Sequence, residues 1–276
     1  MTNPPAGRHR SDIGRSLELM WRGPERSGRG PKPALTLEGI VGAAVHLADR
    51  EGLAALSMRR VAAELGVGTM SLYRYVPGKG ELLDLMVDHV SGPPAEVRAA
   101  REQREGRAGK DWRAVLQLIG ETTYRLYRAH PWLLQVNQSR PLLGPNTLLG
   151  LDFALGALDG LGLGSRERIS VIMTLDSFIT GIARQHVLSR LAAEETGISD
   201  EDFWAAQVPL MESAMASGAY PHVFSLTEDA FSVAEEDMLR FGLTRILDGI
   251  ETFLGNAAAE RQASGPEAGA GVRARG

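Results

Sequence analysis

Apolar residues recur at helical spacing along most of this chain. The first such segment runs from Thr36 to about Glu51, where Thr36 can cap the start of a helix and Gly52 can close its end. Further helical periods are predicted at roughly 111–129, 131–137, 146–161, 165–191, 199–216 and 228–254. Turn signals rich in glycine and proline separate these segments, and no stretch alternates with period two for long enough to form a strand. The pattern therefore predicts an all-α fold.

The stretch 57–79 reads as two short helices that meet at a glycine. Ala62 is small enough to let the helices cross closely, Gly66 can adopt the left-handed backbone of a sharp turn, and Leu72 can fill the angle between the helices. This spacing indicates a helix-turn-helix, whose second helix, Thr69 to Tyr75, would enter the major groove of DNA. An ordinary helical hairpin in a core has the same glycine spacing, so the flanking residues must decide between the two interpretations.

Composition changes mark the limits of the helical segments. Residues 1–35 are rich in Pro, Gly, Ser and Arg and contain at most one amphipathic turn, so we expect a mostly flexible arm. Beyond Pro77-Gly78, a helix from about Gly80 to Val90 leads out of the first domain. The chain is thus expected to comprise the arm over 1–35, a helix-turn-helix domain over 36–90, a second helical domain over 91–255 and a disordered tail over 256–276.

Composition places the chain among folded, soluble proteins. Of its 276 residues, 43% are hydrophobic and 23% are charged, which is typical of a globular protein and not of a disordered one. Cysteine is absent, which excludes disulfides and thiolate metal sites and is compatible with a reducing compartment. The sequence contains neither an apolar run of membrane-spanning length nor the pattern of a signal peptide. We therefore expect a cytoplasmic protein that does not bind membranes.

Charge is distributed unevenly. The net charge of −4 argues against a protein that coats nucleic acid indiscriminately, but a single basic face suffices to bind DNA. The arm is basic, and its end, residues 28–33 with Arg29 and Lys32, resembles the minor-groove core of an AT-hook. A solvated linker whose charges aid solubility is the alternative interpretation of the arm.

The residues around the helix-turn-helix form an extended motif. It consists of Ser57-Met58-Arg59-Arg60-Val61-Ala62, Leu65-Gly66-Val67, Leu72-Tyr73, Tyr75, Lys79 and Leu82-Leu83. With these residues at this spacing, region 37–90 resembles the DNA-binding domain of the TetR/AcrR family of transcriptional repressors. The resemblance favours the DNA-binding interpretation over the plain hairpin.

A weaker resemblance covers the second domain. It rests on His130-Pro131-Trp132, Tyr220-Pro221, Phe241-Gly242-Leu243 and Asp248-Gly249. These residues make 91–255 similar to the C-terminal domain of the tetracycline-repressor subgroup. The resemblance implies a ligand-binding domain that also dimerises through a four-helix bundle, with two helices from each subunit.

The recognition unit offers two kinds of DNA contact. Tyr73 lies at the exit of the second helix and Lys79 at the start of the next one, where a phenol and an ammonium can each reach a phosphate. Arg74 either contacts guanine through two hydrogen bonds, for about 1–3 kcal/mol of discrimination, or meets only phosphate. The predicted DNA-binding residues are Ser57, Arg59, Arg60, Thr69, Met70, Ser71, Tyr73, Arg74, Tyr75 and Lys79, with Arg29 and Lys32 in the arm.

Neither catalysis nor metal binding has support in the sequence. Gly160, Gly162 and Gly164 alternate, but they follow a helix and not the strand that precedes a phosphate-binding loop. The six histidines lack the i, i+4 spacing of a helical metal site. We therefore predict no enzymatic activity, no metal and no cofactor.

A small-molecule pocket is expected in the second domain, because helical domains of this size readily enclose one. Packing in the core is the alternative role for each aromatic residue. The predicted ligand-binding residues are Trp132, Asn137, Gln138, Phe178, Arg184, His186, Trp204 and Tyr220. The helices near 165–191 and 228–254 carry wide apolar stripes, which predict either a homodimer interface or complete burial within one chain.

These features predict a repressor that binds a near-palindromic DNA operator as a homodimer. A small-molecule effector would release it by tilting the helix from Gly80 to Val90, which changes the separation of the two recognition helices. Two alternatives remain open. One is a helix-turn-helix regulator without a small ligand, gated by a partner protein or acting as an activator. The other is an all-α enzyme that uses its first domain only for assembly.

Overall fold

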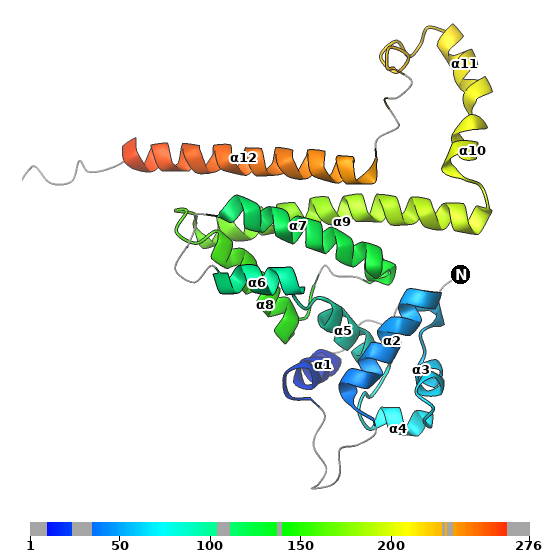
Figure 1. The fold of residues 1–276 in the computed structure, drawn as a ribbon, viewed down its shortest axis with the longest axis vertical. Helices are drawn as coiled ribbons and strands as arrows, with labels where there is room; N and C mark the ends of the chain where they lie inside the picture. Colours follow the sequence, from blue (N-terminus) through cyan, green and yellow to red (C-terminus); the bar gives the residue numbers. More distant parts are fainter. Residues whose placement is uncertain are drawn as a thin grey trace, which may run out of the picture. The chain divides into compact units, whose positions relative to one another are not determined.

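A computed structural model describes residues 10–23, 35–103, 111–136, 140–227, 230 and 234–263, and all its regular secondary structure in these ranges is helical (Figure 1). This confirms the predicted all-α fold. The longer helices are α1 (Arg10–Arg22), α2 (Leu37–Glu51), α5 (Lys79–Val90), α7 (Trp112–Ala129), α8 (Pro145–Ala157), α9 (Ser165–Thr196) and α12 (Glu235–Ala263). The shorter ones are η1 (Leu53–Ala55), α3 (Met58–Glu64), α4 (Thr69–Tyr73), α6 (Ala95–Gln103), η2 (Pro131–Gln135), α10 (Asp200–Ala205) and α11 (Val208–Ala216).

Contacts divide the chain into two compact units. Unit 1 combines Met1–Glu105 with Glu121–Ala154, and unit 2 combines Gly106–Gly120 with Leu155–Gly276. The division passes through α7 and α8, so each of these helices contributes to both units. The domain limits predicted from the sequence at 35, 90 and 255 therefore remain predictions.

Helices α2, α3, α4 and α5 contribute buried side chains to the core of unit 1. Ile40 and Leu47 of α2 and Val61 of α3 are completely buried, as is Leu82 of α5. The ends of α2 are those that its sequence predicts: the Thr36 hydroxyl accepts a hydrogen bond from the Gly39 amide at 3.0 Å, and Gly52 ends the helix with a φ of 79°. Local capping interactions thus define both ends of α2.

The chain before α2 differs from the prediction. Residues 10–22 form the helix α1, which packs against α5, so the expectation of a mostly flexible arm is wrong for this segment. Ile13, Leu17 and Met20 follow a helical i, i+4, i+7 spacing, which is the local signal for this helix. Residues 1–9 and 24–34 of the arm lie outside the described ranges.

Several predicted helix limits also shift. The segment predicted as 131–137 forms the 3-10 helix η2 over Pro131–Gln135, and segment 199–216 breaks into α10 and α11. Pro209 lies near the start of α11, where its missing N–H group is tolerated. Helix α9 continues to Thr196, where Gly197 takes a left-handed conformation. Helix α12 continues past Leu254 to Ala263, so the first residues of the expected disordered tail are helical.

Unit 2 is built around α9 and α12, which lie side by side (Figure 1). Each presents an apolar stripe at helical spacing. The buried stripe residues are Val171, Leu175, Ile179, Ala183 and Val187 of α9 and Leu239, Leu243, Leu247 and Ile250 of α12. Gly120 of α7 packs on the same core, because a Cβ atom there would lie 3.1 Å from the Leu243 side chain. No described helix of the chain is long and apolar enough to cross a membrane.

A close helix contact at Gly242 yields a first prediction. The Phe178 ring of α9 occupies the space that a Cβ atom on Gly242 of α12 would need. Gly242→Ala should therefore displace the ring and lower the free energy of unfolding by about 1–3 kcal/mol, as overpacked core variants do. Chemical denaturation followed by circular dichroism measures the loss.

Gly249→Ala is the matched control on the same helix, because a Cβ atom there meets nothing within 4 Å. It should leave stability unchanged or raise it slightly, since alanine favours a helix over glycine. Equal losses in both variants would contradict the packing explanation.

Candidate nucleic-acid interface

The turn between α3 and α4 has the geometry that its sequence predicts. The Ser57 hydroxyl accepts a hydrogen bond from the Arg60 amide at 3.3 Å and caps the start of α3. At the other end, the Val67 amide donates to the Ala62 carbonyl at 3.0 Å, and Gly66 has a φ of 65°. This is a Schellman ending, in which the left-handed residue is most often glycine. The left-handed turn predicted at Gly66 is confirmed.

Helix α4 turns one side chain inward and several outward. Leu72 is completely buried, as are Val61 and Val76, so Leu72 fills the angle between the helices as expected. Met70 is 78% exposed and Tyr73 is 44% exposed, whereas Thr69, Ser71 and Tyr75 are half-buried and Arg74 is exposed. The regular helix ends at Tyr73, two residues earlier than predicted, and a turn carries Arg74 and Tyr75.

The basic side chains of this unit differ in their pairing. Among the described residues, no carboxylate forms an ion pair with Arg59, Arg74 or Lys79, all of which are exposed. By contrast, the Arg60 guanidinium lies 2.6 Å from a carboxylate oxygen of Glu51. Arg59 is therefore better placed than Arg60 to meet an external phosphate.

Arg60 belongs to an ionic network that connects α2 with α3. Arg50 donates to both carboxylate oxygens of Glu64, at 3.1 and 3.2 Å, and also to Glu51. The hydrogen bonds from Arg50 and Arg60 hold the pKa of Glu51 below its usual value, and those from Arg50 do the same for the pKa of Glu64. The lowered pKa values favour the charged forms of Glu51 and Glu64, which the ionic network between α2 and α3 requires.

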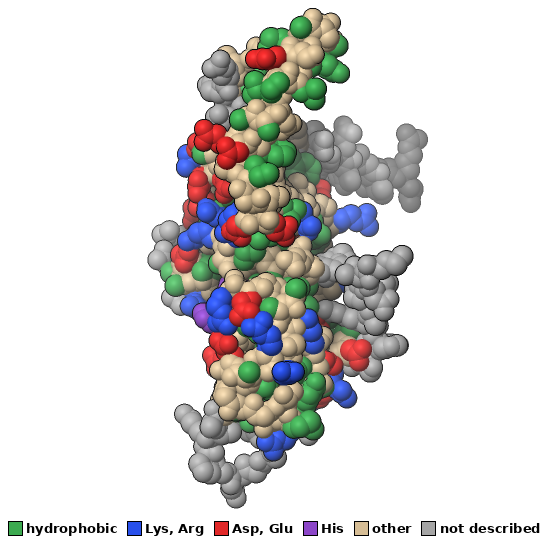
Figure 2. Space-filling model, turned by 90° about the vertical axis from the view of Figure 1, so that its right-hand side faces the viewer, with side chains coloured by type: hydrophobic (Ala, Val, Ile, Leu, Met, Phe, Trp, Pro, Cys, Tyr) green, Lys and Arg blue, Asp and Glu red, His purple; other side chains and the backbone are tan. Residues whose placement is uncertain are grey.

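Figure 2 shows one face of the molecule. Lys and Arg side chains gather in its lower half, where acidic groups and a histidine are interspersed with them. Near its top, hydrophobic side chains lie exposed instead. A mixed basic surface of this kind permits DNA binding at a net negative charge.

Arg29 and Lys32, the predicted DNA contacts of the arm, lie outside the described residues. So do Asn137 and Gln138, two of the predicted ligand-binding residues. Their assignments stay predictions.

Trp132, one of the predicted ligand-binding residues, is buried in unit 1. It is 1% exposed, and its indole nitrogen donates to a carboxylate oxygen of Asp49 at 2.7 Å. His130 Nδ1 lies 2.8 Å from the same oxygen. Asp49 of α2 thereby binds both ends of the His130-Pro131-Trp132 motif, which gives Trp132 a packing role.

The other described ligand-binding candidates belong to unit 2 and have differing surroundings. Phe178 contacts Gly242, and His186 lies 3.8 Å from the Glu235 carboxylate, so both lie where α9 meets α12. Trp204 and Tyr220 are 58% and 55% exposed, and Arg184 is also exposed. Within one chain, these side chains do not share a single enclosed environment.

Three acidic residues outside the predicted sites make polar contacts within unit 1. Asp49 binds η2, and Asp84 and Asp88 of α5 are buried despite their charge. The available signal was their position: Asp84 and Asp88 lie one turn apart among the apolar residues of α5, and a carboxylate is rarely buried without partners.

Two sequence families match this chain. Residues 40–86 match the family described as "Bacterial regulatory proteins, tetR family", and residues 105–254 match "Tetracyclin repressor-like, C-terminal domain". The first range covers the helix-turn-helix and the second covers the helices from α7 to most of α12. Both resemblances predicted from the sequence are confirmed.

Known proteins support the same assignment. The HTH-type transcriptional repressor DrrR1 of Streptomyces coeruleorubidus is 52% identical over 246 residues, which are 88% of this chain and 87% of that protein. Among solved structures, ActR of Streptomyces coelicolor in complex with actinorhodin is 28% identical, with a TM-score of 0.64 over 82% of this chain and all of that one. Apo ActR gives a TM-score of 0.62 at 26% identity over the same shares. The chain therefore belongs to the TetR family of DNA-binding transcriptional regulators, with a C-terminal domain of the tetracycline-repressor type.

Proposed function

We propose that this protein is a repressor that binds a near-palindromic operator as a homodimer and leaves it when a small molecule occupies its C-terminal domain. The observation that carries the proposal is the α3–α4 unit, in which a buried Leu72 supports an exposed recognition surface. The likeness to the repressor DrrR1 favours repression over activation.

The proposed DNA contacts divide into two groups. Thr69, Met70, Ser71, Arg74 and Tyr75 face the base edges, since they occupy α4 and the turn after it. The second group binds phosphates of the DNA backbone and consists of Ser57, Arg59, Tyr73 and Lys79. Lys79 has a second advantage, because it is the first residue of α5, where the positive end of the helix favours an anion. Arg60 contributes only if phosphate displaces Glu51, and Arg29 and Lys32 are proposed as minor-groove contacts.

The proposed dimer uses α9 and α12. Both helices leave large apolar side chains exposed in the single chain, among them Met173 at 57% and Phe241 at 68%. A second copy that covers these side chains would complete a four-helix bundle. Light scattering after size exclusion tests the interface, and a monomer at micromolar concentration would contradict it.

The proposed effector site lies in unit 2, with Phe178, His186 and Arg184 on α9 and Trp204 and Tyr220 beyond it. ActR has been solved with actinorhodin, so that compound is the first to test on this chain. An effector can release DNA only if it binds the released conformation more tightly than the DNA-bound one. The coupling free energy between two such sites is typically about 1–3 kcal/mol. Dissociation of a preformed operator complex on titration with actinorhodin measures this coupling.

The DNA contacts are tested by operator selection from random DNA followed by substitution. The double variant Tyr73→Phe, Lys79→Ala should raise the operator Kd at least about tenfold, because each hydrogen bond to a charged group contributes about 1.5–3 kcal/mol. The salt dependence of binding should also weaken, since the slope falls by about 0.9 for each phosphate that the protein no longer neutralises. Fluorescence anisotropy at several salt concentrations measures both quantities.

The matched control is Arg166→Ala, which removes an exposed positive charge at the start of α9. It should leave the operator Kd and its salt slope close to those of the unchanged protein. If the double variant behaves like this control while remaining folded, α4 and the start of α5 are not the DNA-binding surface.

A further inference from the structure

Helix α1 precedes both of the family regions that match this chain, and the proposed function does not use it. One residue of α1 is buried against α5. The Ser16 side chain is completely buried, and its hydroxyl donates to a carboxylate oxygen of Asp84 at 2.7 Å. Asp84 itself is 8% exposed. A hydroxyl–carboxylate bond in such surroundings is strong, because water does not compete with it.

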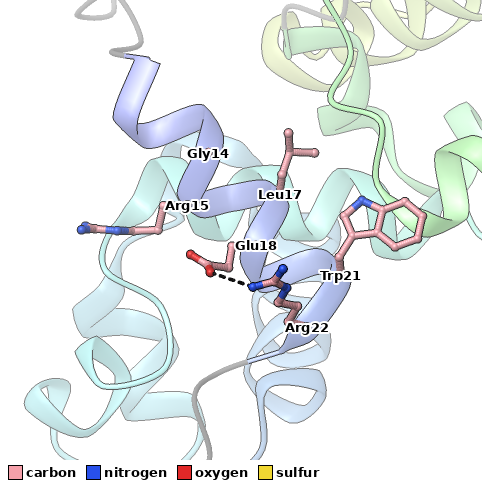
Figure 3. A pocket seen from close by; sticks show the side chains of 6 residues that line it. All are labelled: Gly14, Arg15, Leu17, Glu18, Trp21 and Arg22. Carbon is pink, nitrogen blue, oxygen red and sulfur yellow. Dashed lines mark ion pairs between the residues drawn. The ribbon is translucent and has the colours of Figure 1, made fainter.

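The C-terminal turn of α1 reaches a different element. The Trp21 indole nitrogen donates to the Leu143 carbonyl at 3.1 Å, in the segment just before α8. Figure 3 shows Trp21 and Leu17 on the side of α1 that faces this segment, while Arg15 points away from it. The ion pair between Glu18 and Arg22 joins successive turns of the same helix (Figure 3). Helix α1 therefore contacts α5 and the entry to α8 at the same time.

The carboxylate of Asp88 completes the connection. Asp88 lies one turn after Asp84 on α5, and its Oδ1 accepts hydrogen bonds from the Thr147 amide at 3.0 Å and the Thr147 hydroxyl at 2.9 Å. The Asn146 amide lies 3.4 Å from the same carboxylate. Asp88 thus caps the start of α8, where a negative charge is favoured.

Gly144 marks the point where the three helices meet. A Cβ atom on Gly144 would lie 2.8 Å from the Met20 sulfur of α1 and would overlap the Asp88 carboxylate of α5. Only glycine lets α1, α5 and the segment before α8 approach one another this closely.

We propose that α1 is a positioning element for DNA recognition: through Ser16, which binds Asp84 of α5, and Trp21, which binds the Leu143 carbonyl, it reinforces the direct contact of Asp88 with the start of α8. Helix α5 begins with Lys79 and follows α4 directly, so restricting α5 restricts the recognition helix. This role rests on the proposed DNA contacts only through Lys79 and α4. The orientation of α4 relative to α8 can be measured without DNA or effector.

The absence of cysteine makes a direct distance measurement practical. Spin labels at Met70→Cys on α4 and Gly150→Cys on α8 lie within unit 1, and both positions accept a side chain, since Met70 is 78% exposed and a Cβ atom on Gly150 meets nothing within 4 Å. Dilution with unlabelled protein removes distances between subunits. Pulsed electron paramagnetic resonance then reports how firmly α4 is held relative to α8.

In the labelled but otherwise unchanged protein, we expect a single narrow distribution of distances between the two labels. Ser16→Ala, Trp21→Phe and deletion of residues 1–23 should each broaden the distribution or add a second distance, because α5 gains orientations that α1 now prevents. Thr36→Ala is the matched control, since it also removes a hydroxyl that forms one hydrogen bond in unit 1 but lies outside the contacts of α1. It should leave the distribution narrow.

Unchanged distributions in the two point variants, at a temperature where circular dichroism shows them folded, would overturn the proposal and leave α1 as a cover for α5. If the deletion variant does not fold, the point variants decide. Because no operator takes part, this result is independent of whether Lys79 and α4 bind DNA.

Discussion

Trp132→Ala is expected to lower the free energy of unfolding by about 3–5 kcal/mol, the usual range for a buried tryptophan. The side chain is 1% exposed, and its removal also leaves the Asp49 carboxylate without its indole donor. Urea denaturation followed by far-ultraviolet circular dichroism measures the loss without relying on tryptophan fluorescence.

Trp204→Ala is the matched control, because the same residue type is 58% exposed on α10. Its effect on stability should stay within about 0.5 kcal/mol, as is usual for surface substitutions. If Trp132→Ala proved as mild as Trp204→Ala and instead abolished effector binding, the packing role of Trp132 would be refuted.

Trp132→Phe separates the volume of the ring from its hydrogen bond. Phenylalanine keeps an aromatic ring on η2 but cannot donate to Asp49. The variant should recover a substantial part of the stability lost in Trp132→Ala. The difference that remains measures what the hydrogen bond to Asp49 contributes together with the change in ring size.

Leu72→Ala should cost about 2–5 kcal/mol, because it opens a cavity at the fully buried centre of the helix-turn-helix. The substitution also removes the side chain that sets the angle between α3 and α4, so operator binding should weaken even under conditions where the protein remains folded. Denaturation and anisotropy titration measure the two effects separately.

Met70→Ala, on the same turn of α4, controls for the loss of an apolar side chain without loss of core, since Met70 is 78% exposed. It should leave stability almost unchanged while it alters contacts with DNA. A Leu72→Ala protein as stable as Met70→Ala would contradict the position of Leu72 in the core.

Local chemistry explains which parts of the fold could be predicted. Thr36, Gly52, Ser57 and Gly66 end or begin helices through hydrogen bonds and backbone angles within a few residues of themselves. Such signals depend only on neighbours in the chain. Helix periodicity is equally local, which is why the all-α class and most of the helices were predicted correctly.

Partners distant in the sequence decided the features that local patterns did not predict. Arg59 and Arg60 are adjacent and identical in type, yet only Arg60 meets Glu51, nine positions earlier. Helix α1 was not predicted because its short apolar pattern becomes decisive only when α5 lies beside it. The same reason applies to Asp84 and Asp88, whose burial depends on Ser16 and Thr147.

The sequence by itself determined the helix-turn-helix, its capping residues and the TetR family, because these follow from residue types at fixed short spacing. Only the tertiary structure decided which of two tryptophans is core, which of two arginines is paired, and that the segment before the DNA-binding helices folds onto α5. Burial and ion pairing arise when segments distant in the sequence pack together, and local sequence patterns do not determine the free energy of that packing.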